Sequence, residues 1–138
     1  MVLSLQGVLS DRERPEQAAE LLERAMAAVP GPTIRGRFAD RLTDRGIERN
    51  NARSYEEGAN DLRWALRLNP CSQRTCSNLG VVLQNLALDQ RARGRSGAAL
   101  ETVEELCRLA ERSMKDESLQ DSFAPLQKWA QEAAASWK

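Results

Sequence analysis

Apolar residues along the chain recur at helical spacing, and the same arrangement occurs three times. Three small residues each precede an apolar residue by four positions and another by seven; the sets are Ala18, Leu22, Ala25; Gly58, Leu62, Ala65; and Ala99, Val103, Leu106. Positions i, i+4 and i+7 lie on one face of an α-helix. The pattern therefore predicts one type of amphipathic helix in three copies, at about 15–29, 54–69 and 97–112.

The spacing of these copies indicates a helical repeat. Pro30 and Pro70 close the first two copies and are 40 residues apart. Two further helical stretches, 33–51 and 72–91, each follow one of these prolines and open with Thr33 or Ser72 as a possible N-cap. A period in this range is typical of stacked helical hairpins. We expect an all-α array over residues 1–115.

The last segment, 116–138, carries a single narrow apolar stripe. Its members follow one another at spacings of four and three residues, and they are Leu119, Phe123, Leu126, Ala130, Ala133 and Trp137. Polar residues fall off this stripe: Asp121, Gln127, Lys128, Gln131 and Glu132. One apolar and one polar side predict a C-terminal capping helix, with a break expected before Pro125.

The second copy resembles helix B of a tetratricopeptide repeat. The resemblance rests on Tyr55-Glu56-Glu57-Gly58, on Leu62, Ala65-Leu66 and Leu68, and on the closing Asn69-Pro70. Arg45-Gly46-Ile47 and Leu79-Gly80 stand where this family has its Leu-Gly pair. The chain departs from the family at Gly58, which replaces a customary alanine, at Arg45 and Arg49, which replace apolar residues, and in its long period.

The resemblance implies a right-handed stack of about two and a half to three helical hairpins, with the A helices lining a concave groove that holds peptides or helices of protein partners. The family as a whole is not catalytic. Within this frame, counting along the A helices gives candidate partner-binding residues: Asp40, Ile47, Asn50, Asn51, Arg74, Asn78, Val81 and Asn85, with Thr43, Ser77 and Gln84 on the same side.

The amides and the arginine of this set suit peptide recognition. Asparagine both donates and accepts hydrogen bonds, and Arg74 can bind a carboxylate through two nitrogens. The alternative interpretation is structural. Asn50 and Asn51 would then end a helix, where asparagine tolerates the required backbone geometry, while Arg74, Asn78 and Asn85 would be solvated surface residues.

Charge and composition exclude several classes. Lys plus Arg and Asp plus Glu are 20 each, so no overall field favours a nucleic acid or an anionic membrane as partner. Histidine is absent, and the spacing of the three cysteines, Cys71, Cys76 and Cys107, matches no common metal or redox motif. We expect no enzyme activity, cofactor or metal. No apolar run approaches membrane-spanning length, and the N-terminus lacks the basic start of a secretory signal, so we expect a cytoplasmic protein.

Other features carry two interpretations each. Arg91-Ala92-Arg93-Gly94-Arg95-Ser96 is a basic stretch that either binds an acidic or phosphate group or simply ends one helix and caps the next at Ser96. Trp64 and Trp129 either form a contact surface or pack between helices. For Cys71 and Cys76 the alternatives are a thiolate at a helix start and a small buried apolar residue, and we favour burial.

These observations predict a non-catalytic scaffold that binds a protein or peptide and is a monomer or weak homodimer. The alternative is a small dimeric helical chaperone or regulator of a secretion or signalling system, whose exposed apolar edge would lie before Asp11. A catalytic domain would need paired carboxylates in a pocket. Glu101, Glu104 and Glu105 instead have the spacing of a solvated helix face.

Overall fold

The computed structural model describes residues 32–138, and this part of the chain contains five helices and no strand. The expected all-α class is therefore confirmed there. The expected helix at 15–29 and the edge before Asp11 lie outside the described residues. The helices are α3 (Pro32–Asn51), α4 (Tyr55–Leu68), α5 (Gln73–Ala92), α6 (Ser96–Ser113) and α7 (Glu117–Ser136).

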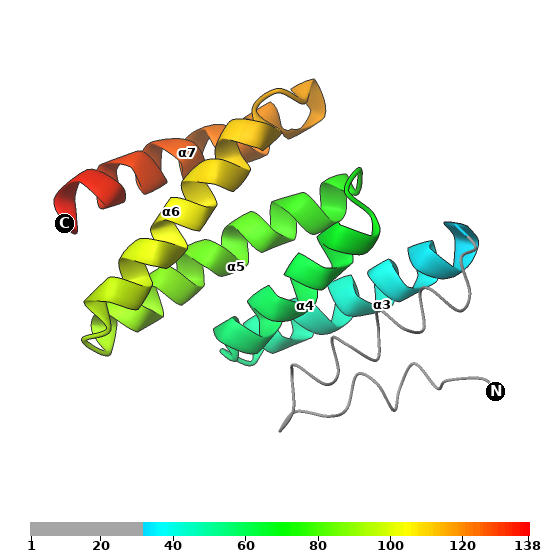
Figure 1. Cartoon of the computed structure of the whole chain (residues 1–138), viewed down its shortest axis with the longest axis horizontal. Helices are drawn as coiled ribbons and strands as arrows, with labels where there is room; N and C mark the ends of the chain where they lie inside the picture. The colour runs from blue at the N-terminus through cyan, green and yellow to red at the C-terminus, as the bar shows by residue number, and fades with distance from the viewer. Residues whose placement is uncertain (1–31) are drawn as a thin grey trace.

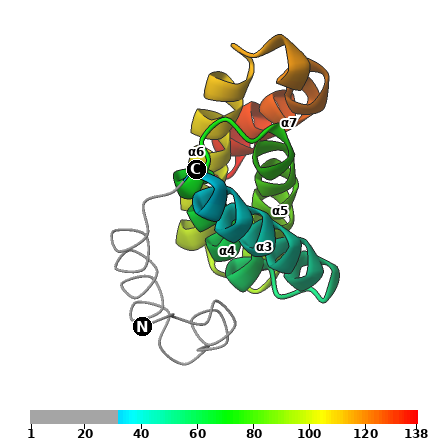
Figure 2. The same cartoon turned by 90° about the vertical axis from the view of Figure 1, so that its right-hand side faces the viewer.

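The helices form two layers. Figures 1 and 2 show α3, α5 and α7 side by side, with α4 and α6 packed across them on the other side. Consecutive helices are antiparallel neighbours, so α3 and α4 make a first hairpin, and α5 and α6 make a second one. Helix α5 lies in the middle and contacts each of the other four.

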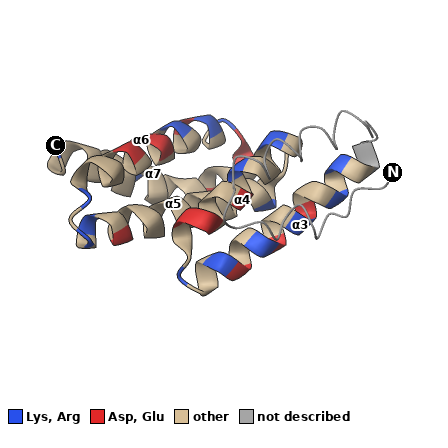
Figure 3. Cartoon of the chain, turned by 60° about the horizontal axis from the view of Figure 1, so that its bottom comes forward, with Lys and Arg blue, Asp and Glu red and all other residues tan. Residues whose placement is uncertain are grey.

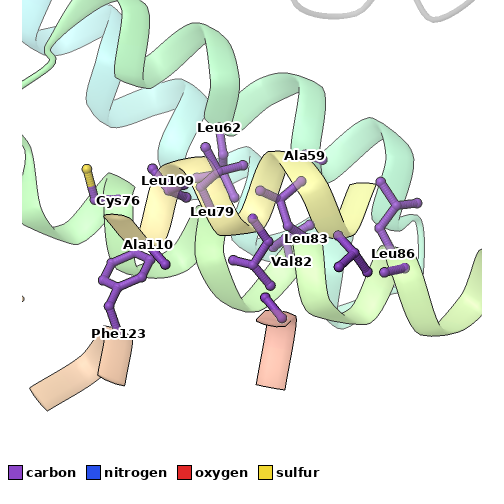
Figure 4. Packing of buried hydrophobic residues seen from close by; sticks show 14 of the residues in the cluster. Ala59, Leu62, Cys76, Leu79, Val82, Leu83, Leu86, Leu109, Ala110 and Phe123 are labelled. Atoms are coloured by element: carbon purple, nitrogen blue, oxygen red, sulfur yellow. The ribbon is translucent and has the colours of Figure 1, made fainter. Parts of the chain in front are cut away.

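The main hydrophobic core lies between the layers and draws on α4, α5, α6 and α7. Figure 4 shows its central side chains, among them Leu62, Leu83 and Phe123, which are fully buried. A smaller cluster joins α3 to α4 through Leu42 and Ala65. Burial of the apolar stripes predicted at helical spacing accounts for this arrangement, because each amphipathic helix hides one face.

Both hairpins turn through one residue in the left-handed backbone region. These residues are Arg53, with φ 66°, and Gly94, with φ 77°. After each left-handed residue, the next backbone N–H donates to a carbonyl oxygen of the preceding helix and so closes its C-terminus. The bonds are Ser54 N to Arg49 O at 2.8 Å and Arg95 N to Gln90 O at 2.9 Å. All equivalent positions of the two hairpins are 41 residues apart.

One of the three expected N-caps is present. Ser72 precedes α5, and its side chain accepts a hydrogen bond from Thr75 N at 3.2 Å. Thr33 is not a cap, because α3 already begins at Pro32, a residue well suited to a first helical position. Ser96 is not a cap either, since it is the first residue of α6 and the preceding residue makes no side-chain capping bond.

Helix α7 is continuous, so the expected break before Pro125 was wrong. A proline inside a helix removes one backbone hydrogen bond, and here both Pro125 and Asp121, the residue four positions earlier, are exposed. The carbonyl group of Asp121, which loses its helical hydrogen bond, therefore lies on the solvent-exposed side of α7. The stripe itself is confirmed, since Leu119, Phe123 and Ala130 are buried.

Glycine permits two close helix contacts, only one of them within a hairpin. A Cβ on Gly46 would lie 2.7 Å from Leu62 Cγ and 3.0 Å from the carbonyl oxygen of Gly58, so α3 and α4 touch there backbone to backbone. A Cβ on Gly80 would lie 2.9 Å from Phe123 Cε1. Gly80 therefore allows α7 to pack closely against α5. It does not serve the contact between α5 and its hairpin partner α6, so it is not the equivalent of Gly46.

Candidate functional site

The predicted partner-binding residues lie on α3 and α5, which are neighbours in one layer. We call this surface the α3–α5 face, and it comprises Asp40, Ile47, Asn50, Asn51, Arg74, Asn78, Val81, Asn85 and, as added below, Leu88. Asp40, Asn51, Arg74 and Val81 are exposed, while the remaining predicted residues are half-buried. Nothing in the structure tests whether a partner binds there, and the assignment stays a prediction.

Two side-chain contacts join α3 and α5 across this face. Asn85 Nδ2 donates to Asn50 Oδ1 at 3.0 Å, and Arg74 forms an exposed ion pair with Asp44. Asn50 therefore does more than end a helix, and the left-handed residue of this turn is Arg53 rather than either asparagine. The amides hold each other at one end of the face, and the charges meet at the other end.

Asn78 behaves as the structural alternative predicted. Its Nδ2 donates to the carbonyl oxygen of Arg74, one turn earlier in the same helix, at 2.8 Å. The carbonyl oxygen of the side chain keeps its acceptor capacity. One of the two N–H donors of Asn78 is thus satisfied within its own helix.

Sequence reasoning included Val81 in this face but missed a second exposed apolar residue, Leu88. Val81 and Leu88 are each 45 % exposed, and they are the large hydrophobic residues exposed within residues 32–138. They are seven positions apart on α5 with Asn85 between them, so the three side chains share one side of the helix. The signal available in the sequence was this seven-residue spacing, outside the apolar stripe that enters the core.

Thr43 lies beneath the face instead of on it. It is 1 % exposed, and its hydroxyl is 2.8 Å from that of Thr75, which is equally buried. Thr43 Oγ1 also donates to Ala39 O at 2.8 Å. This buried pair links α3 to α5, because each hydroxyl satisfies the other away from water. The expectation that Thr43 lies on the exposed side of α3, with the candidate residues, was wrong.

A buried carboxylate, Asp61, lies inside the first hairpin and was also missed. Asp61 is 6 % exposed, and it accepts from Arg45 Nε at 3.0 Å and pairs with an Arg49 terminal nitrogen at 3.1 Å. Burial raises the pKa of Asp61, and the charges of Arg45 and Arg49 act against that increase. The two arginines that depart from the family pattern thus have a structural reason: they neutralise a carboxylate on α4.

Another arginine–carboxylate pair connects the hairpins in the second layer. Arg63 of α4 donates to both carboxylate oxygens of Glu105 of α6, at 2.8 and 2.7 Å. Glu105 is therefore not merely part of a solvated face, in contrast to the expectation. Such two-point pairs fix orientation as well as distance.

The tryptophans support the packing interpretation. Trp64 is half-buried and packs with Phe38 and Leu68 against the smaller cluster, with Arg67 4.8 Å above its ring. Trp129 packs against the main core and meets Trp137 edge-on, with ring centroids 5.6 Å apart. The main role of both Trp64 and Trp129 is to cover core residues.

The three cysteines are free thiols, in three different environments. Cys76 is buried as expected, and burial raises the pKa of its thiol, which disfavours the thiolate. Cys107 is half-buried, with its pKa raised for the same reason. Cys71 is exposed, so the expectation of burial was wrong for this residue.

Within residues 32–138, no three histidine, cysteine or acidic side chains are arranged to hold a metal ion. In the same range no helix combines the length and hydrophobicity that crossing a bilayer requires. Comparisons with protein-family models, with curated proteins and with solved structures find no significant match to this chain.

Proposed function

We propose that this chain is a tetratricopeptide-like interaction module that binds a segment of a protein partner on the α3–α5 face. The observation that carries the proposal is the row formed on α5 by Val81, Asn85 and Leu88. Exposed apolar side chains that flank a hydrogen-bonding amide offer both contact area and direction to a bound peptide.

The two-layer arrangement supports this proposal. In a right-handed stack of hairpins, helices α3, α5 and α7 would be the A helices whose free side forms the concave surface. The α3–α5 face belongs to this layer. Three free cysteines further support action in a reducing compartment, and we propose the cytoplasm.

The decisive test uses the two exposed apolar residues. A variant with Val81→Ser and Leu88→Ser keeps the core intact and removes the apolar contact area from the face. The matched control carries Ala124→Ser and Ala135→Ser, at exposed positions of α7. Peptides selected from a displayed library against wild type are then titrated against all three proteins by calorimetry, after circular dichroism confirms equal helicity.

We expect the control to bind as wild type does, while the variant binds about tenfold more weakly or not at all. Equal affinity of the variant and wild type would place the binding site elsewhere. Sedimentation at several concentrations tests the dimeric alternative. Self-association that disappears in the Val81→Ser, Leu88→Ser variant would identify a second copy as the occupant of the face and contradict the peptide proposal.

A further inference from the structure

An arginine-rich corner lies at the end of α5, apart from the proposed row of apolar residues. We use the name arginine corner for Arg91, Arg93 and Arg95 together with Trp137 of α7. The three arginines are exposed, and Figure 3 shows the turn after α5 in the colour of basic residues. Only Arg93 has a carboxylate partner among the described residues, Asp89 at 3.1 Å.

The turn does not need these arginines. At the equivalent turn of the first hairpin, 41 residues earlier, Asn50, Ala52 and Ser54 occupy the same positions. The backbone bonds nevertheless match: Ala52 N to Glu48 O at 3.0 Å corresponds to Arg93 N to Asp89 O at 3.1 Å. Since the first turn forms with other residues at these three positions, the backbone of the turn does not require the cluster.

The structure also supplies an aromatic support that the local sequence lacks. The Arg91 guanidinium lies 4.5 Å from the centroid of the Trp137 ring, and Trp129 packs against the same ring. A guanidinium held over an aromatic ring can still donate from its nitrogens to an anion, and it loses less freedom when it binds one. Because Arg91 and Trp129 both contact the Trp137 ring, that ring is poorly placed to stack a base.

We propose that the arginine corner binds an acidic segment of a protein partner, with glutamate or aspartate carboxylates accepting from Arg91 and Arg95. Charge complementarity carries the assignment, because the corner offers two guanidinium groups that have no carboxylate partner within residues 32–138, on a chain whose net charge is zero. This surface and its ligand are independent of the α3–α5 face and of the proposed function.

The test uses a fluorescein-labelled glutamate-rich peptide, a reference peptide with glutamine in place of each glutamate, and labelled oligothymidine, all measured by fluorescence anisotropy. The corner variant is Arg91→Gln with Arg95→Gln. The control, Arg41→Gln with Arg108→Gln, removes the same charge at exposed positions of α3 and α6. Arg91→Lys keeps the charge but loses the planar group.

We expect the glutamate peptide to bind wild type and the control within twofold of each other, and the corner variant about tenfold more weakly. Arg91→Lys should bind about threefold more weakly than wild type. The proposal is overturned if wild type does not bind the glutamate peptide, if the glutamine peptide binds equally well, or if both double variants lose the same affinity. Tighter binding of oligothymidine would assign the corner to nucleic acid and also overturn it.

Discussion

The two hairpins share one backbone plan and differ in the chemistry at its centre. In the first hairpin, Arg49 of α3 pairs with the buried Asp61 of α4. At the equivalent positions of the second, Thr102 donates to Gln90 at 2.7 Å. A charged link and a neutral link thus occupy the same place. The comparison teaches that both hairpins place a polar contact at this point, and that the second forms it without charge.

The two hairpins also differ at the point where their two helices cross. Gly46 and Gly58 meet backbone to backbone in the first hairpin. The equivalent residues of the second are Ala87 and Ala99, both buried. The second crossing accommodates two methyl groups that the first cannot, so its helices have no need of so close an approach.

The largest effect is expected from breaking the charged link. Asp61→Thr removes the buried carboxylate that pairs with Arg45 and Arg49, which are 24 % and 11 % exposed, while Arg49 keeps its ion pair with Glu57 at 3.5 Å. We expect a loss of about 3 kcal/mol in the free energy of unfolding, measured by urea denaturation. The triple variant Arg45→Leu, Arg49→Gln, Asp61→Thr carries the residues of the second hairpin and should regain wild-type stability. A triple variant as unstable as the single one would show that the two links are not interchangeable.

The next largest effect on stability is expected from adding a methyl group where Gly46 of α3 crosses Gly58 of α4. Gly46→Ala places a methyl group against Leu62 and the Gly58 carbonyl, at a cost of about 2 kcal/mol that exceeds the helix propensity gained. Gly36→Ala on the same helix meets no atom of residues 32–138 within 4 Å and is the control. It should stabilise by about 0.5 kcal/mol. Thermal unfolding compares them, and similar shifts for both variants would contradict a close crossing.

Substitutions of the left-handed turn residues, Arg53 and Gly94, should have smaller effects on stability, and these effects should be opposite in sign. Arg53→Gly should stabilise the protein by about 1 kcal/mol, because glycine adopts the positive φ without steric cost. Gly94→Ala should destabilise it by a similar amount. Gly97→Ala, at an exposed position where a Cβ meets no atom of the described residues within 4 Å, serves as the control in chemical denaturation. Destabilisation by Arg53→Gly would show that the Arg53 side chain itself matters.

The smallest effect concerns the link between the hairpins. Arg63 and Glu105 are about one-third exposed, at 35 % and 30 %, so solvent weakens their attraction. A double-mutant cycle with Arg63→Gln and Glu105→Gln should give a coupling energy of about 0.5 kcal/mol that decreases in high salt. A zero coupling energy at low salt would mean that the Arg63–Glu105 pair does not help to hold the two hairpins together.

The spacing of apolar residues was sufficient to predict where the helices lie, but it was insufficient to predict which side chains contact one another. The apolar stripes that predicted α4, α6 and α7 work because each of these helices buries one side against a single core. Thr43 was misplaced because it lies at the border between the buried and exposed sides of α3, where counting residues cannot separate them. Pro125 was misjudged because its cost depends on whether the freed carbonyl faces water.

The contacts of the candidate site depend on how helices are set against one another. Arg45 and Arg49 were visible as unusual residues, yet their partner Asp61 follows only from the angle between α3 and α4. Gly80 has the residue type that the family motif predicts. The 41-residue correspondence of the two turns shows, however, that Gly80 is not the equivalent of Gly46, and its close contact is with Phe123 of α7. The proximity of Trp137 to Arg91 joins segments distant in sequence.

The central position of α5 has a consequence for the lifetime of any complex. Both proposed surfaces include residues of this helix, Val81, Asn85 and Leu88 in one and Arg91 in the other, and the helix contacts α3, α4, α6 and α7. Local opening reaches first those segments that have few neighbours, so the amide hydrogens of α5 should be the slowest to exchange with solvent. A partner held by α5 would then leave by its own dissociation rather than through fraying of its binding site.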